Sequence, residues 1–168
     1  LLFLSLANPP ASRAFACGVS WGIGYGAIGI SWVHISIDTF GGLPKFASLA
    51  LMFLLVSYLS IYPALFAAVL NRWFPNANLA RFLLAAPSLW LINEWLRGWV
   101  MTGFPWLWLG YSQVDSPLNV FAPIGGVDSI SYIIWLIAGA ITLALNQKHW
   151  HLLAIPVGIL SRAGSLTF

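Results

Sequence analysis

Long apolar runs alternate with short polar segments along the chain, and each run approaches the length of a bilayer crossing. A membrane-spanning helix needs about 20 consecutive apolar residues. The pattern predicts spans at about 14–37, 46–70, 82–101 and 125–145, with partial spans at 1–8 and 150–160. We therefore expect an all-α, polytopic membrane helical bundle.

The two ends of the chain do not resemble complete spans. The first ten residues, LLFLSLANPP, are typical of a helix that is already under way, and the last apolar run is interrupted at Ser161–Arg162. We expect a transmembrane helical domain over 1–160 that is truncated at both ends, followed by an atypical tail over 161–168.

Composition supports a surface that faces lipid. Hydrophobic residues make up 60% of the 168 positions and charged residues 7%, whereas soluble domains carry roughly a quarter charged residues. The formal charge of +3 is too small and too dispersed to indicate nucleic-acid binding. With Cys17 as the single cysteine and no CxxC or His/Cys cluster, we expect no internal disulfide, no metal and no cofactor.

The distribution of Lys and Arg predicts the orientation of the chain. Alternate loops place Arg13, Arg72, Arg81 and Lys148 on one side, and Lys45 and Arg97 on the other. Cytoplasmic loops are the richer in Lys and Arg. We expect the 71–81 and 146–151 loops to be cytoplasmic and the 38–45 and 98–123 loops to be periplasmic.

Small residues recur at every fourth position in the first complete span, at Ala14, Gly18, Gly22 and Gly26. Such a strip lets another helix backbone approach closely, which is how many helices associate in lipid. The spacing predicts a helix-packing face.

A second face carries polar and aromatic residues near the end of span 82–101. Trp90, Asn93, Glu94 and Arg97 are spaced to lie on one side of a helix. Glu94 and Arg97 can pair at i, i+3, and ionisable groups in a membrane helix avoid lipid. We expect this face to point into the bundle or into a wet cavity.

An irregular loop rich in aromatic residues follows, and it allows two interpretations. The rings of Trp99, Trp106, Trp108 and Tyr111 suit the headgroup level of a membrane. In one interpretation they form an aromatic belt, and the ion pair only anchors the helix. In the other, Arg97 binds a lipid phosphate and the indoles line an acyl groove.

No catalytic constellation is evident in the sequence. Ser31, His34 and Asp38 share a helical face, but side chains on one helix project outward, whereas a Ser-His-Asp triad needs them to converge. Cys17 has no base nearby in sequence, and Glu94 is a single carboxylate beside a cation, which makes a poor general base.

Three stretches resemble the apolipoprotein N-acyltransferases: SWVHISIDTFGGLP (31–44), EWLRGWVMTGFPWLWLGYSQVDSPL (94–118) and FAPIGGVDSISY (121–132). The resemblance implies a bacterial inner-membrane enzyme with eight membrane helices and a periplasmic nitrilase-like α/β domain. That domain would carry a Glu-Lys-Cys triad, and no residue of this chain matches a triad position. We expect the nitrilase-like domain to be absent from this chain.

The resemblance also implies a reaction and its partners. The enzymes move an acyl chain from a phospholipid to the N-terminal S-diacylglyceryl-cysteine of a lipoprotein, so the partners are a phospholipid donor, a diacylated lipoprotein acceptor and membrane lipid. The candidate substrate-binding residues are Trp90, Glu94, Arg97, Phe104, Pro105, Trp106, Tyr111 and Gln113. We expect the fragment to be inactive alone. The alternatives are a transporter or channel segment that uses the 93–97 face, and a purely structural membrane anchor.

The orientation is testable by cysteine scanning with a membrane-impermeant thiol reagent on intact cells. We expect labelling of Ser112→Cys, which lies in a predicted periplasmic loop, and none of Asn76→Cys. Labelling of Asn76→Cys and not of Ser112→Cys would contradict the predicted orientation.

Overall fold

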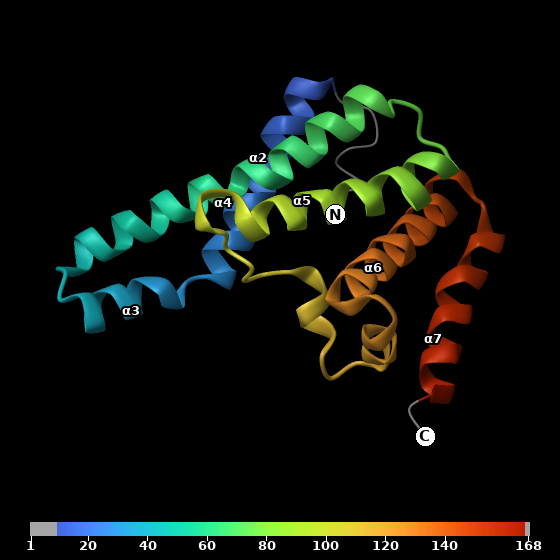
Figure 1. Ribbon diagram of the computed structural model, residues 1–168. Helices are drawn as coiled ribbons and strands as arrows, with labels where there is room; N and C mark the ends of the chain where they lie inside the picture. The colour runs from blue at the N-terminus through green and yellow to red at the C-terminus, as the bar shows by residue number, and fades with distance from the viewer. Residues whose placement is uncertain (1–9, 167–168) are drawn as a thin grey trace. The chain divides into compact units, whose positions relative to one another are not determined.

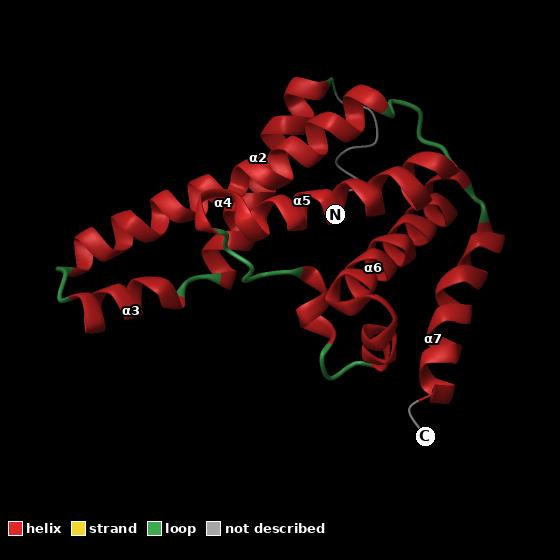
Figure 2. Cartoon of the chain, in the orientation of Figure 1, coloured by secondary structure: helices red, strands yellow, loops and turns green. Residues whose placement is uncertain are grey.

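The computed structural model describes residues 10–166, and these residues form helices and connecting loops with no strand among them. The longer helices are Ala11–Gly29 (α2), Trp32–Gly41 (α3), Lys45–Trp73 (α4), Ala86–Trp99 (α5), Ala122–Gln147 (α6) and Ala154–Leu166 (α7) (Figures 1 and 2). Short helical turns lie at Ala80–Ala85 (η1), Val100–Thr102 (η2), Leu109–Gln113 (η3), Pro117–Phe121 (η4) and Trp150–Leu153 (η5). The predicted all-α class is confirmed, while the partial span expected at 1–8 lies outside the described residues.

The chain divides into two compact units, Leu1–Trp73 and Phe74–Phe168. In the first unit, α2 packs along α4 through the predicted strip of small residues, all four of which are buried. A Cβ atom at Gly18 would lie 2.5 Å from Ala64 Cα, and one at Gly22 would lie 2.8 Å from Ser60 Cα. The backbones are therefore closer than any larger residue allows, and the predicted packing face is confirmed.

The expected span at 14–37 is not one straight helix. It divides into α2 and α3, which are bent by 52° at a short break. Gly29 stands directly before the break, and glycine has the lowest helix propensity of any residue except proline. Within the break, Ser31 Oγ donates to Ile28 O at 3.1 Å. The side chain thus bonds to the preceding turn at the point where the regular backbone ladder is interrupted.

The second unit is built on η1 and α5, which run antiparallel to α6. Gly139 of α6 meets the backbone of η1 so closely that a Cβ there would lie 2.3 Å from Phe82 O. Further along, the rings of Trp90 and Trp135 pack with their centroids 4.7 Å apart. Leu118, Ile130 and Ala163 then join η4, α6 and α7 in one apolar cluster. These contacts pack η1 and α5 against α6, and the loop between α5 and α6 lies next to them.

The last helix extends further than expected. The sequence predicts an atypical tail from residue 161, but α7 continues to Leu166. Ser161 Oγ donates to Gly158 O at 3.1 Å and Ser165 Oγ donates to Arg162 O at 2.9 Å. Because these hydroxyls bond to the preceding turn, the polar residues are accommodated within the helix.

Two described helical segments are long and apolar enough to cross a membrane, Lys45–Trp73 and Pro117–Leu145, and α2 with α3 makes a third if the bent pair is one span. The segment predicted at 82–101 is not among them. Its regular helix α5 has 14 residues, and Asn93, Glu94 and Arg97 lower its hydropathy. The helix that carries the polar face, α5, is thus shorter and more polar than the segments that are long and apolar enough to cross a membrane.

The seam between α2 and α4 makes a direct prediction about two glycines of the same helix. Gly18→Ala should destabilise the fold by about 1–3 kcal/mol, because the new methyl group overlaps the α4 backbone. Gly24→Ala is the matched control, since nothing lies within 4 Å of a Cβ at that position, and alanine favours a helix by about 1 kcal/mol. Thermal unfolding in detergent micelles measures both, and equal stability of the two variants would contradict the seam.

Candidate functional site

The polar face of α5 is buried within the second unit. Trp90, Asn93, Glu94 and Arg97 are all buried and lie on one side of the helix, as the spacing predicted. The predicted ion pair is present, with 3.9 Å between Arg97 Nη2 and Glu94 Oε1. The side chains of Glu94 and Arg97 are 1% and 6% exposed, so the pair is almost completely buried.

The chain reverses direction directly after α5. Phe104 N–H donates to Arg97 O at 2.8 Å and Gly103 N–H donates to Val100 O at 3.1 Å. Gly103 has a φ of 79°, and a Cβ there would lie 2.0 Å from Gly98 O. Only glycine fits a position that combines a left-handed backbone with such close contact. This reversal directs residues 104–110 back along the polar face of α5.

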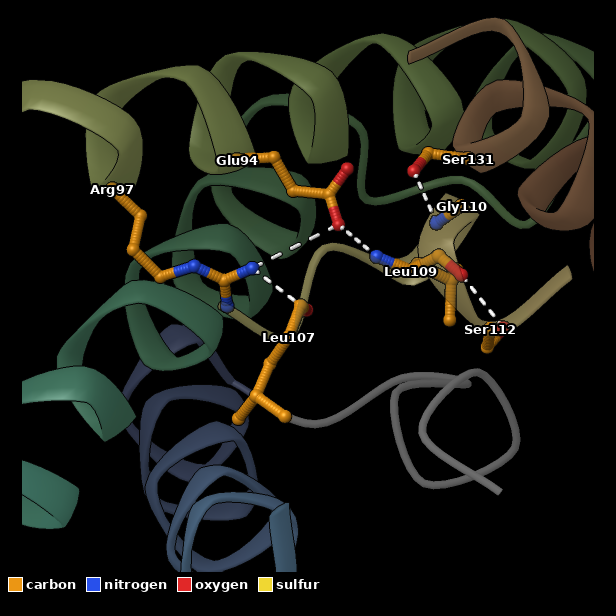
Figure 3. A network of polar contacts seen from close by, with 7 residues as sticks. All are labelled: Glu94, Arg97, Leu107, Leu109, Gly110, Ser112 and Ser131. Atoms are coloured by element: carbon orange, nitrogen blue, oxygen red, sulfur yellow. Dashed lines mark hydrogen bonds and ion pairs between the residues drawn. The ribbon is translucent and has the colours of Figure 1, made fainter. Parts of the chain in front are cut away.

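The returning loop is held by the ion pair through its main chain (Figure 3). Arg97 Nη2 donates to Leu107 O at 2.9 Å. Leu109 N–H donates to Glu94 Oε1 at 2.7 Å. Glu94 Oε2 is buried and has no hydrogen-bond partner among the described residues. One oxygen of the carboxylate therefore carries both the loop contact and the ion pair.

These contacts offset local strain in the loop. Leu107 has a φ of 65°, a left-handed conformation that costs a residue with a side chain roughly 1–2 kcal/mol. A hydrogen bond to a charged group contributes about 1.5–3 kcal/mol. The two bonds from Arg97 and Glu94 are together strong enough to hold a conformation that the loop alone does not favour.

Two glycines allow the loop to lie close to α5 and α6. A Cβ at Gly98 would lie 3.0 Å from Trp108 Cζ2, so the bare glycine leaves room for the indole. On the other side, Gly110 N–H donates to Ser131 Oγ of α6 at 2.9 Å, and a Cβ at Gly110 would lie 2.3 Å from Val127 O. The loop is thus fixed to α5 on one side and to α6 on the other.

Next to these contacts the loop forms a hollow of about 390 Å³, lined by Pro105, Trp106, Leu107 and Tyr111. The lining is mostly apolar, and Trp106 and Tyr111 remain 55% and 53% exposed. The Tyr111 ring stacks with Trp108 at a centroid distance of 6.1 Å. The hollow is therefore open on one side, and Tyr111 in its wall is packed against Trp108.

The eight predicted site residues fall into three groups. Trp90, Glu94 and Arg97 lie in the buried face of α5, and Pro105, Trp106 and Tyr111 line the hollow; Phe104 and Gln113 belong to neither set. The Phe104 ring packs against Trp106 at 5.4 Å, and Gln113 Nε2 donates to Ser112 Oγ at 3.0 Å. Direct binding of a phosphate by Arg97 stays a prediction, although the described contacts of its guanidinium favour a role in holding the loop.

Several residues of the site were missed by sequence reasoning. Leu107, Leu109 and Gly110 contribute through backbone atoms, and Ser131 contributes one hydroxyl from a different helix. Backbone contacts leave little trace in residue type. The one available signal is Gly110, whose lack of a side chain permits the close approach to α6.

The other candidate residues form no reactive arrangement where the structure describes them. His34 Nδ1 contacts the carbonyl oxygen of Ser31, one turn earlier on the same chain segment. Ser31 Oγ is bonded to Ile28 O. Cys17 is a free, half-buried thiol. Within the described residues, no three His, Cys, Asp or Glu side chains are grouped so that they could hold a metal ion.

The fold and the site together define a class: a helical membrane protein whose buried ion pair supports an exposed aromatic loop. A family model described as the apolipoprotein N-acyltransferase N-terminal domain matches residues 1–140, and the chain belongs to this family. The predicted resemblance is confirmed.

Similar proteins carry the same name. The apolipoprotein N-acyltransferase of Vibrio cholerae is 58% identical over 157 residues, which are 94% of this chain and 31% of that protein. The Vibrio vulnificus protein is 53% identical over 167 residues, which are 99% of this chain and 33% of its own length. The Shewanella oneidensis protein is 52% identical over 151 residues, covering 88% of this chain and 29% of its own length. The chain spans about a third of the length of these relatives.

Proposed function

We propose that this chain forms the N-terminal membrane domain of an enzyme that moves an acyl chain from a phospholipid to the N-terminal S-diacylglyceryl-cysteine of lipoproteins. Two observations support the proposal: the match to the family's N-terminal domain, and relatives named apolipoprotein N-acyltransferase that are 52% to 58% identical over most of this chain. Helices long and apolar enough to span a membrane agree with a lipid substrate.

We further infer that the domain lies in the bacterial inner membrane, with the 38–45 and 98–123 loops on the periplasmic side. The excess of Lys and Arg in the other loops supports this orientation. One of those cations, Arg81, is buried and donates to Phe74 O at 2.7 Å. Its charge is therefore tied to the 74–75 loop, and Arg13, Arg72 and Lys148 support the orientation more directly.

The hollow is the proposed contact site for an acyl chain of the phospholipid. The single observation that carries this assignment is an open, mostly apolar hollow on an irregular loop, walled by two half-exposed aromatic rings, Trp106 and Tyr111. An acyl chain that leaves the bilayer for this loop needs apolar surface to stay out of water, since each methylene group exposed to water costs about 0.8 kcal/mol. The hollow provides apolar surface for that transfer, and Phe104 and Trp108 brace its walls.

The alternative of a transporter path along the α5 polar face receives less support. Glu94 and Arg97 are buried and bonded to each other and to the loop backbone. A polar pathway needs such groups to face a water-filled route. The contacts that these two residues make fit a support for the loop better.

The experiment replaces the matching segment of the Vibrio cholerae enzyme with this chain and measures acyl transfer from phospholipid to a diacylated lipopeptide. We expect the chimera to be active. Trp106→Ala and Tyr111→Ala should each raise KM for phospholipid about tenfold, because each removes a large apolar wall worth roughly 1.5–3 kcal/mol when covered.

The matched control is Trp150→Ala, which removes a tryptophan that is 58% exposed and lies outside the hollow. It should leave KM unchanged. A folded but inactive chimera would contradict the proposed function of the chain. An equal effect of Trp106→Ala and Trp150→Ala would contradict the assignment of the hollow.

A further inference from the structure

Glu94 and Arg97 are placed to act on the hollow without lining it. Neither belongs to the wall formed by Pro105, Trp106, Leu107 and Tyr111. Both are almost completely buried. Their contacts with the loop go to main-chain atoms, so an effect on any ligand must pass through the loop.

The two contacts enclose a short stretch of backbone. Arg97 holds the carbonyl oxygen of Leu107, and Glu94 holds the N–H of Leu109, while 3.9 Å separates Arg97 Nη2 from Glu94 Oε1 (Figure 3). Trp108 lies between the two fixed positions. Trp106 directly precedes this stretch and Tyr111 follows it by two residues, so the two fixed positions lie in sequence between the two aromatic walls of the hollow.

The conformation that the pair holds is one that the loop does not favour by itself. Leu107 has a left-handed backbone with a φ of 65°. A residue with a Cβ keeps such a conformation only where its surroundings enforce it. Without Arg97 and Glu94, the peptide at Leu107 is free to relax, and the walls of the hollow would lose their spacing.

Stability alone does not account for a buried pair of this kind. Replacing a buried ion pair with apolar side chains of similar volume is often neutral or stabilising, because both charges must be removed from water. The better attested use of a buried polar pair is to select one arrangement of the chain. Here the selected arrangement is that of residues 107–109.

We propose that Glu94 and Arg97 are positioning residues, which hold the loop at Leu107 and Leu109 so that Trp106 and Tyr111 face the hollow. The inference rests on the proposed function in so far as the hollow receives an acyl chain. It differs from binding of a phosphate by Arg97, because the guanidinium acts on the loop backbone and does not touch the lipid.

The first measurement follows the loop itself and needs no ligand. In the 168-residue chain, a Leu109→Cys probe in a Cys17→Ser background reports the seating of the loop by its rate of alkylation with N-ethylmaleimide in membranes. Leu109 is half-buried, and its N–H remains available to Glu94 in the probe. Arg97→Gln and Glu94→Ala should each raise the rate about tenfold, as expected for the loss of one charge-assisted bond.

The second measurement follows phospholipid use in the chimera. Arg97→Gln and Glu94→Ala should each raise KM about tenfold and leave kcat within about twofold. The double variant should be no worse than the more affected single variant, because both residues act through one loop. Arg97→Lys should rescue in part, since it can donate to Leu107 O but lacks the planar fork. Glu94→Gln should rescue in part, since it keeps the acceptor for Leu109 N–H.

Gly18→Ala is the control for a general loss of stability. It disturbs the seam between α2 and α4, so it should lower the unfolding temperature and leave both the alkylation rate and KM unchanged. If it raises KM as much as Arg97→Gln does, the KM effect reports destabilisation and the inference is wrong.

The remaining outcomes separate the inference from the proposed function. Unchanged alkylation in both Arg97→Gln and Glu94→Ala overturns the positioning role. A rise in KM for Arg97→Gln but not for Glu94→Ala overturns it in favour of direct contact between Arg97 and the lipid. If Trp106→Ala and Tyr111→Ala leave KM unchanged, the acyl site is wrong, while the alkylation rates still decide whether the pair positions the loop.

Discussion

The buried pair of Glu94 and Arg97 is the interaction on which the candidate site depends. A carboxylate and a guanidinium are costly inside an apolar bundle unless each finds a partner. Here each partners the other and also a backbone atom of the returning loop. The main chain at Leu107 and Leu109 thus supplies one hydrogen-bond partner to each charged group, and α5 fixes the course of the loop. The position of the aromatic hollow follows from this mutual requirement.

Glycines make this arrangement possible by allowing close approach of the backbone. Gly103 turns the chain back, Gly98 leaves room for Trp108, and Gly110 lets the loop lie directly against α6. The same device joins α2 to α4 in the first unit, where Gly18 and Gly22 face the α4 backbone. In lipid, helices gain little from burying apolar side chains against each other, so close packing and polar contacts carry more of the association. The first unit relies on close backbone packing, and the second unit combines close backbone packing with polar contacts.

The sequence predicted those features that depend on side-chain type and spacing, and not those that depend on backbone geometry. The strip of small residues, the shared face of α5 and the ion pair all follow from helical periodicity, and the structure confirms them. The break between α2 and α3 and the continuation of α7 to Leu166 are accompanied by local hydrogen bonds of Ser31, Ser161 and Ser165, which the apolar pattern does not show. The hollow was predicted only in part, because the loop that forms it is held by main-chain atoms of Leu107 and Leu109, which residue type does not reveal.

Amide hydrogen exchange at Leu109, measured by NMR on the chain in lipid nanodiscs, tests the central claim most directly. Leu109 N–H donates to a buried carboxylate oxygen, so it should exchange at least about tenfold more slowly than an unstructured peptide of the same sequence. Glu94→Ala should remove this protection, while Gly110 N–H, which is bonded to Ser131, should keep most of its own. Exchange of Leu109 at the unstructured rate in the unmodified chain would contradict the account, because the loop would then not be held by the pair.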